Sequence, residues 1–431
     1  MGALPLSIAL CLISPAPARG LPEVRAVPYP ESAPTHPAQP DPPAAIPSFD
    51  TSTPEPAPEQ PRPPGAASLT VAGGGKGARW TSGDERFSLG LTVRAQVRYE
   101  AELEDESAEQ SFLIRRARVK SSGWMFGRDF RYQFELGLSP RDMGMTDDGA
   151  RFSPLLDWFF EFGQLRDLTV RVGQSKLAYS LTRVQSSGNL QFVDRSPANA
   201  EFNLDRDIAL DLRSYDLFGL GRLRYFAGVF LGEGRDARGA TNFEMGSFGR
   251  VEVYPFGNDG THGYQVDFSR APRPRLMLGA AYAFVDGATR DRGTRGNAPE
   301  DGGTTDMHNV TADASFKMAG LSFLGEGFVR RTRRVAGPSI PAGGNLDPGR
   351  DGWGWSGQAG YVLAPRAVEF AARYGETHPL RQSPVARLRQ PGAAVSYYVL
   401  RHALKFQFDY HATLTDGAPG HLLRLQFQGS L

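Results

Sequence analysis

Arginine side chains recur at alternate positions in several segments that are otherwise rich in apolar residues. A guanidinium group donates two parallel hydrogen bonds to neighbouring oxygens of a phosphate and keeps its charge at physiological pH. A row of such groups on one face of adjacent strands has the chemistry to hold or conduct an anion. The candidates on the polar faces of expected strands are Arg94, Arg98, Arg116, Arg118, Lys120, Arg131, Arg171, Arg222 and Arg224.

The same arginines permit a second interpretation. The chain has 43 Arg and 5 Lys, a bias that genomic base composition also produces. Carboxylates on the same polar faces are available to neutralise the arginines, and a weakly selective polar wall would result. These carboxylates are Asp129, Glu135, Asp313, Glu326, Glu369 and Asp409.

The elements that must position these side chains are long strands. Apolar and polar residues alternate without a break from Phe87 to Tyr99, and again over residues 130–138 and 404–410. In a strand, successive side chains point to opposite faces. Strands in soluble sandwiches usually run five or six residues, whereas these are long enough to cross a bilayer at a tilt. The pattern therefore favours membrane-spanning strands.

The connections between these strands alternate between long polar segments and short turns. Outer-membrane barrels show this alternation, with long external loops and short periplasmic turns. The pattern predicts an all-β fold, a 16-stranded antiparallel transmembrane β-barrel over residues 81–431, with both ends periplasmic. The even number of strands closes the barrel without a free edge, as lipid requires.

The N-terminal part has a different composition. An apolar core over residues 4–13 and the Ala16-Pro17-Ala18 site predict a signal peptide at 1–18, and hence export through the periplasm to the bacterial outer membrane. Residues 22–64 hold 15 prolines, and residues 73–77 are mostly glycine. We expect 19–80 to be a Pro/Gly-rich disordered periplasmic segment, with 73–77 as linker.

Several other functions lack support in the sequence. The formal net charge of +1 gives no reason to expect a nucleic-acid partner. The chain has one cysteine, within the expected signal peptide, and no Gly-x-Ser-x-Gly or His-Glu-x-x-His motif. We therefore expect no enzymatic activity, no cofactor and no metal site.

A set of short stretches resembles the phosphate-selective porin O and P family. They follow one another in order along the expected barrel and read FLIRRARV at 112–119, VRVGQSK at 170–176, QFVDRS at 191–196, RDI at 206–208, GVF at 228–230, RVEVYPF at 250–256, GQAGY at 357–361 and ARY at 372–374. The resemblance implies a homotrimer whose arginines line an anion path. It also implies that residues 177–205 fold into the barrel, with Arg183 and Arg195 as constriction candidates.

These observations together predict an outer-membrane porin. We expect passive diffusion of small anions, foremost phosphate or polyphosphate, through an arginine-lined lumen, with outer-membrane lipid around the barrel. Two alternatives remain: a weakly selective general porin, and a plugged or structural surface barrel that binds a partner through its external loops.

Overall fold

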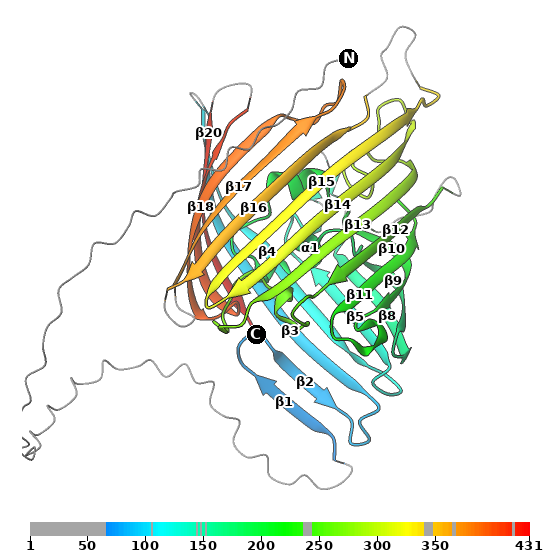
Figure 1. The fold of residues 1–431 in the computed structure, drawn as a ribbon, viewed down its shortest axis with the longest axis vertical. Coiled ribbons are helices and arrows are strands. Elements are labelled where there is room, and N and C mark those ends of the chain that lie inside the picture. The colour runs from blue at the N-terminus through cyan, green and yellow to red at the C-terminus, as the bar shows by residue number, and fades with distance from the viewer. Residues whose placement is uncertain are drawn as a thin grey trace, which may run out of the picture. The chain divides into compact units, whose positions relative to one another are not determined.

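The structure is a computed structural model that describes residues 66–104, 107–143, 145–146, 149–150, 153–235, 244–339, 348–363, 368–415 and 419–431. Sixteen antiparallel strands of the described chain form a closed barrel, in which β20 pairs with β3 (Figure 1). The strands are β3 (Ser88–Glu104), β4 (Ser107–Trp124), β5 (Phe130–Gly137), β8 (Leu155–Leu165), β9 (Leu168–Lys176), β10 (Arg206–Ser214), β11 (Leu223–Phe230), β12 (Gly246–Val253), β13 (Arg275–Ala288), β14 (Thr304–Met318), β15 (Leu321–Val335), β16 (Gly352–Val362), β17 (Val368–Pro379), β18 (Leu388–Leu400), β19 (Leu404–Thr413) and β20 (Gly420–Ser430). The predicted fold class is confirmed.

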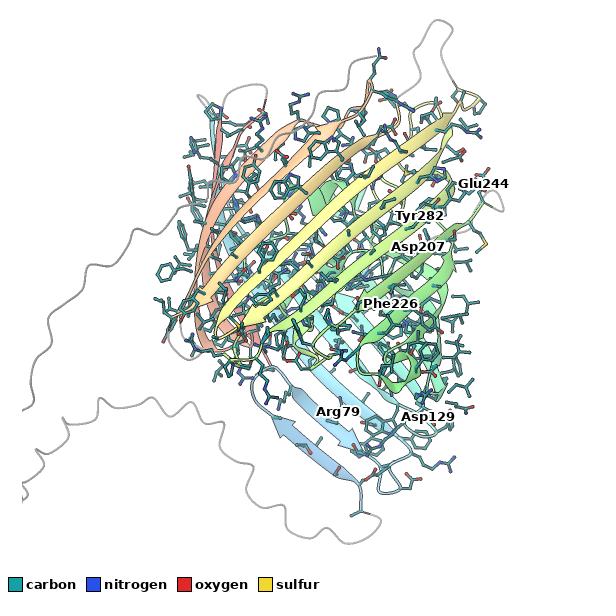
Figure 2. The ribbon with its side chains drawn as sticks, viewed as in Figure 1. Arg79, Asp129, Asp207, Phe226, Glu244 and Tyr282 are labelled. Carbon is teal, nitrogen blue, oxygen red and sulfur yellow. The ribbon has the colours of Figure 1, made fainter. Side chains whose placement is uncertain are left out.

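Alternation decides which face of each strand meets lipid. On β3, Leu89 and Leu91 are exposed on the outer face, whereas Gln96 and Arg98 are buried in the lumen. Figure 2 shows the side chains along the strands, and its labelled Tyr282 on β13 belongs to the exposed apolar set. An apolar outer face and a polar inner face are what a barrel in lipid requires.

The remaining regular elements are short. Helical turns are α1 (Leu181–Val184), η1 (Ser187–Asn189), α2 (Pro197–Phe202), η2 (Leu217–Gly219) and η3 (Thr261–Gly263), and a small separate ladder joins β6 (Met145–Thr146) to β7 (Gly149–Ala150). No helix in the described part of the chain is long and apolar enough to span a membrane.

An N-terminal hairpin corrects one expectation. Strands β1 (Ser68–Ala72) and β2 (Gly77–Thr81) form a hairpin, and β2 pairs with the first residues of β3. Gly77 has a φ of 70°, and an added Cβ would lie 2.0 Å from a backbone oxygen of β3, so only glycine fits there. The expectation of a disordered segment up to residue 80 was therefore wrong from residue 68 onward. Residues 1–65, with the expected signal peptide and proline-rich segment, lie outside the described residues.

Candidate functional site

The segment of residues 177–205, here called the constriction loop, lies inside the barrel. On one side, Glu326 of β15 accepts hydrogen bonds from the hydroxyl of Ser180 at 2.8 Å and the backbone of Thr182 at 2.9 Å. On another side, Asp409 of β19 accepts from the backbone of Val193 at 2.9 Å. These contacts with separate parts of the wall show that the loop crosses the lumen.

Glycines in the wall make room for the constriction loop. Residues Gly352 and Gly354 face the loop helix α2, and an added Cβ at either position would lie 2.8–3.0 Å from the nearest ring carbon of Phe202. At Gly360, an added Cβ would lie 1.9 Å from the side chain of Gln191. Any larger side chain at these positions would displace the loop, since packed interiors leave little free volume.

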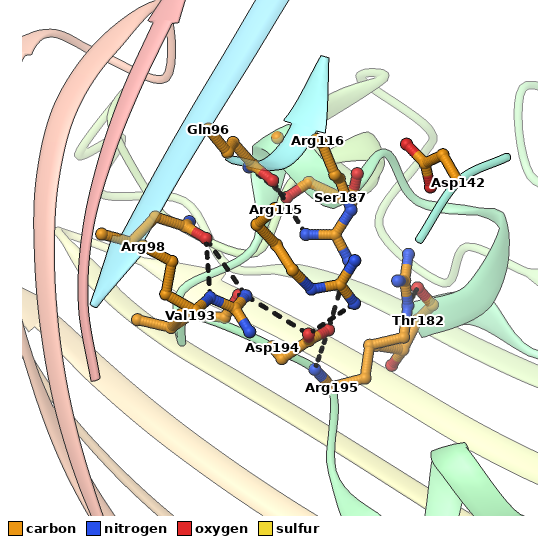
Figure 3. Close-up of polar contacts among 12 residues, drawn as sticks. Gln96, Arg98, Arg115, Arg116, Asp142, Thr182, Ser187, Val193, Asp194 and Arg195 are labelled. Carbon is orange, nitrogen blue, oxygen red and sulfur yellow. Dashed lines mark hydrogen bonds and ion pairs between the residues drawn. The ribbon is translucent and has the colours of Figure 1, made fainter. Parts of the chain in front are cut away.

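The constriction loop carries a carboxylate that several arginines share (Figure 3). Asp194 lies 3.3 Å from the guanidinium of Arg98, 3.1 Å from that of Arg115 and 3.5 Å from that of Arg116. Burial raises the pKa of Asp194, but Arg116, Arg115 and then Arg98 lower it more, so this pKa lies well below its usual value. Asp194 is therefore ionised, and it joins the loop to β3 and β4.

The two arginines expected at the constriction fasten the loop to itself. Arg183 forms an ion pair with Asp205, at the other end of the loop. Arg195 donates to the backbone oxygens of Thr182 at 2.8 Å and Gln185 at 2.9 Å. Both side chains are mostly buried, so they hold the shape of the loop and do not line an open wall.

A second segment, residues 254–274 between β12 and β13, also enters the lumen from the end with the short turns. We call it the inner turn. Gln265 donates to the side chain of Gln185 at 3.1 Å and accepts from the backbone of Gln191 at 2.9 Å. Lys317 of β14 donates to the backbone of Tyr264 at 2.5 Å. The inner turn is thereby attached both to the wall and to the constriction loop.

Beside these two segments a cavity of about 620 Å³ extends along the wall formed by β3–β5 and β8–β12. It reaches from the hairpin turn at residues 74–75 to the constriction loop at residues 181–189. Its charged lining side chains are Arg94, Arg118, Lys120, Glu135, Asp157, Arg171, Lys176, Arg213, Arg224, Arg250 and Glu252.

Most of these cations are neutralised. Five form ion pairs at 3.4 Å or less with carboxylates: Arg118 with Asp142, Arg171 with Glu161, Arg213 with Asp211, Arg224 with Glu252 and Arg250 with Asp313. Of the charged lining residues, Arg94, Lys120 and Lys176 form no ion pair within the described chain.

The two histidines that line the cavity carry no charge. Burial, followed by the nearby Lys317, lowers the pKa of His262 to about 4. Burial also lowers the pKa of His402 well below its usual value. Both rings are therefore neutral at neutral pH, and the excess charge of the cavity rests on lysine and arginine.

Two of the unpaired cations donate to consecutive residues of the constriction loop. Arg94 donates to the hydroxyl of Ser186 at 2.7 Å. Lys176 donates to the backbone oxygen of Gln185, the residue before Ser186, at 3.0 Å. Lys120 lies on β4, with Thr92 opposite it on β3. All three side chains line the same cavity.

The wall residues proposed from the sequence fall into separate groups in the structure. Arg94, Arg118, Lys120, Arg171 and Arg224 line the cavity. Arg98 and Arg116 face the lumen but bind Asp194.

The other two proposed wall residues lie elsewhere. Arg131 is exposed and donates to the backbone oxygen of Arg128, and Arg222 is exposed just before β11. Neither is among the cavity-lining residues, because both lie close to short turns.

The sequence-based prediction included Arg116 but missed its neighbour Arg115 and several other lumen residues. Arg115 and Arg116 both face inward because a β-bulge interrupts the register between β3 and β4 at this point. Strict alternation would place these two neighbours on opposite faces. Arg213 and Arg250 follow the alternation of β10 and β12, so extending that pattern would have found them. Lys176 does not follow the alternation of β9, because it lies five residues after Arg171 and both residues line the cavity.

A closed antiparallel barrel with an apolar outer face, a polar lumen and a loop folded across it defines the class: the chain is a bacterial outer-membrane porin, a channel and not an enzyme. A family model described as phosphate-selective porin O and P matches residues 87–419, so the chain belongs to that family. The resemblance noted in the sequence is confirmed.

Solved structures share this fold. The anion-selective porin from Comamonas acidovorans is similar at a TM-score of 0.53 and 11% identity, over 80% of this chain and 100% of that one. The outer membrane channel DcaP of Acinetobacter baumannii is similar at a TM-score of 0.50 and 10% identity, over 80% of this chain and 97% of that one. No curated protein matches the chain by sequence. At such identities the likeness concerns the fold alone.

Proposed function

We propose that this porin prefers small anions, with phosphate or polyphosphate as its main solutes. The single observation that carries the proposal is that three cations of the cavity lining, Lys120, Arg94 and Lys176, have no ion pair within the described chain. The charge of lumen residues selects ions by its sign. Because the other charged lining residues are paired, these three side chains set the sign of the field that a passing ion meets.

The chemistry of these three cations suits an oxyanion. An ammonium group offers three rotatable donors, and a guanidinium offers a planar fork that matches two oxygens of a phosphate. Arg94 and Lys176 already donate to oxygens of the constriction loop. An anion at the loop would accept from the same side chains, and these bonds would replace part of its hydration.

A weakly selective general porin is the second candidate, and the many ion pairs of the lumen favour it. A plugged barrel is the third, favoured by the hydrogen bonds between the constriction loop and the inner turn. A general porin retains current without ion preference, whereas a plugged barrel gives no steady current.

Single-channel recording of the refolded protein in planar bilayers separates the three candidates. We expect a steady current whose reversal potential under a KCl gradient shows anion preference, and a block of this current by added phosphate. A reversal potential near zero would leave a general porin. The absence of current from folded protein would favour the plugged barrel.

The assembly and processing of the chain are further parts of the proposal. As the family resemblance implies, the barrel would act as a homotrimer in outer-membrane lipid. Export through the periplasm would remove residues 1–18, and the proline-rich segment would act as a periplasmic tether. Cross-linking of the folded protein and N-terminal sequencing of the mature chain test these points.

A further inference from the structure

The outer face of β15 changes from apolar to basic near one end of the strand. Leu321 and Val329 are exposed on this face. Arg331 and Arg333 follow at alternate positions and are exposed as well. The turn between β14 and β15 is short, so Leu321 lies at the periplasmic end of the strand and the two arginines lie at the external end. Both arginines point away from the lumen, and the proposed anion path does not use them.

The depth of Arg331 in the membrane follows from strand geometry. It lies ten residues after Leu321, and a strand rises about 3.3 Å per residue. At a tilt of about 40°, ten residues cross about 25 Å, which is the height of the apolar band of an outer-membrane barrel. Arg331 therefore lies at the level of the external lipid headgroups, where an outward-facing arginine is far less costly than at the midplane.

Aromatic side chains of the neighbouring strands mark the same level. On β14, which lies beside β15 (Figure 1), His308 stands directly opposite Arg331. The hydroxyl of Tyr282 on β13 lies 2.8 Å from Nδ1 of His308, and both side chains are exposed. On the other side of β15, Trp353 of β16 stands opposite Val329. Tyr and Trp collect at the membrane–water interface because each has an apolar ring and a polar group.

One of the two arginines has no carboxylate partner. Arg333 lies 3.1 Å from Asp306 of β14, and its side chain is 81% exposed. Arg331 forms no hydrogen bond or ion pair within the described residues. The exposed Asp286 lies on β13, two strands away. Residues directly opposite in a ladder have Cβ atoms about 5 Å apart, and alternate residues of one strand lie about 7 Å apart. Arg331, Arg333 and His308 therefore bring their donors within reach of one tetrahedral oxyanion.

We propose that Arg331, Arg333 and His308 form a binding site on the outside of the barrel for the phosphate headgroup of a lipid in the external leaflet. A guanidinium donates two parallel hydrogen bonds to phosphate oxygens. A neutral His308 that accepts from Tyr282 at Nδ1 keeps its proton on Nε2 and is a further donor. The exposed Val329, on the membrane side of the arginines, offers apolar surface to an acyl chain. Basic and apolar surface side by side fit a lipid better than a free phosphate ion.

The test is a titration of the refolded full-length porin in neutral detergent with phosphatidic acid, a lipid that carries a phosphate monoester. Native mass spectrometry counts the bound lipid. We expect the double variant Arg331→Gln, Arg333→Gln to raise the dissociation constant about thirtyfold, equivalent to about 2 kcal/mol, because each arginine near an anionic headgroup contributes about fivefold. Diacylglycerol, which lacks the phosphate, should bind wild type and variant equally weakly. The reversal potential of the pore should not change, because both side chains lie outside the lumen.

The matched control is the double variant Arg128→Gln, Arg131→Gln. Both residues are exposed near a short turn at the opposite end of the barrel, and Arg128 pairs with Glu85. An equal loss of lipid affinity in the control would mean a general charge effect and overturn the inference. Displacement of the lipid by an excess of inorganic phosphate would assign the site to the free ion and overturn it too.

Unchanged lipid affinity in the double variant of β15 would also overturn the inference. A loss of cross-linked oligomers in that variant would then assign this face to a second copy of the chain. If the double variant does not fold, Arg331→Gln alone serves with the same criteria and an expected change of about fivefold.

Discussion

Lys120 is the cavity cation whose replacement should disturb the structure least. Its ammonium group lines the cavity and has no hydrogen bond or ion pair among the described residues. The other two unpaired cations, Arg94 and Lys176, hold the constriction loop. Lys120→Gln and Lys120→Glu therefore change the charge of the wall without loosening the loop.

The size of the effect follows from Coulomb's law. In water, unit charges about 8 Å apart interact with about 0.5 kcal/mol. Without the charge of Lys120, a passing chloride ion loses this attraction and a potassium ion loses the same repulsion. The combined change of about 1 kcal/mol lowers the chloride-to-potassium permeability ratio about fivefold, and charge reversal lowers it about thirtyfold.

The assay is the reversal potential of single channels under a KCl gradient near 0.1 M, where the screening length is about 10 Å. Near 1 M it falls to about 3 Å, and we expect most of the effect to disappear. Lys76→Glu is the control, since Lys76 is exposed in the hairpin turn and does not line the cavity. A wild-type reversal potential for Lys120→Glu at low salt, or an equal shift in the control, would refute the reasoning.

Three further substitutions test how the two inner segments are held. Asp205→Ala removes the carboxylate from the mostly buried ion pair with Arg183, which should lower the free energy of unfolding by about 2–4 kcal/mol. An unchanged midpoint of denaturant unfolding would contradict this. In Gly354→Val, the added Cβ would lie 3.0 Å from the ring of Phe202. We therefore expect a displaced constriction loop and a higher single-channel conductance than in wild type. A conductance equal to that of wild type would count against this contact. Lys317→Met removes bonds to two backbone oxygens of the inner turn, so limited proteolysis should cleave this turn faster than in wild type.

Much of the barrel could be predicted because its pattern is local. Leu89 and Leu91 face lipid while Gln96 and Arg98 face the lumen, as the alternation of β3 indicates, and the alternating connections gave the number of strands. The wall residues could be predicted for the same reason wherever a strand is regular. Arg115 could not, because a bulge depends on the register of the neighbouring strand.

The sequence by itself determined that this chain is a barrel with a charged lumen, since strand geometry depends on neighbouring residues. Only the tertiary structure decided which lumen charges are neutralised. Arg250 on β12 meets Asp313 on β14, and Asp194 on the constriction loop meets β3 and β4. Such pairs join residues far apart in the chain, so the free charge of the pore depends on closure of the barrel and the folding of its loop.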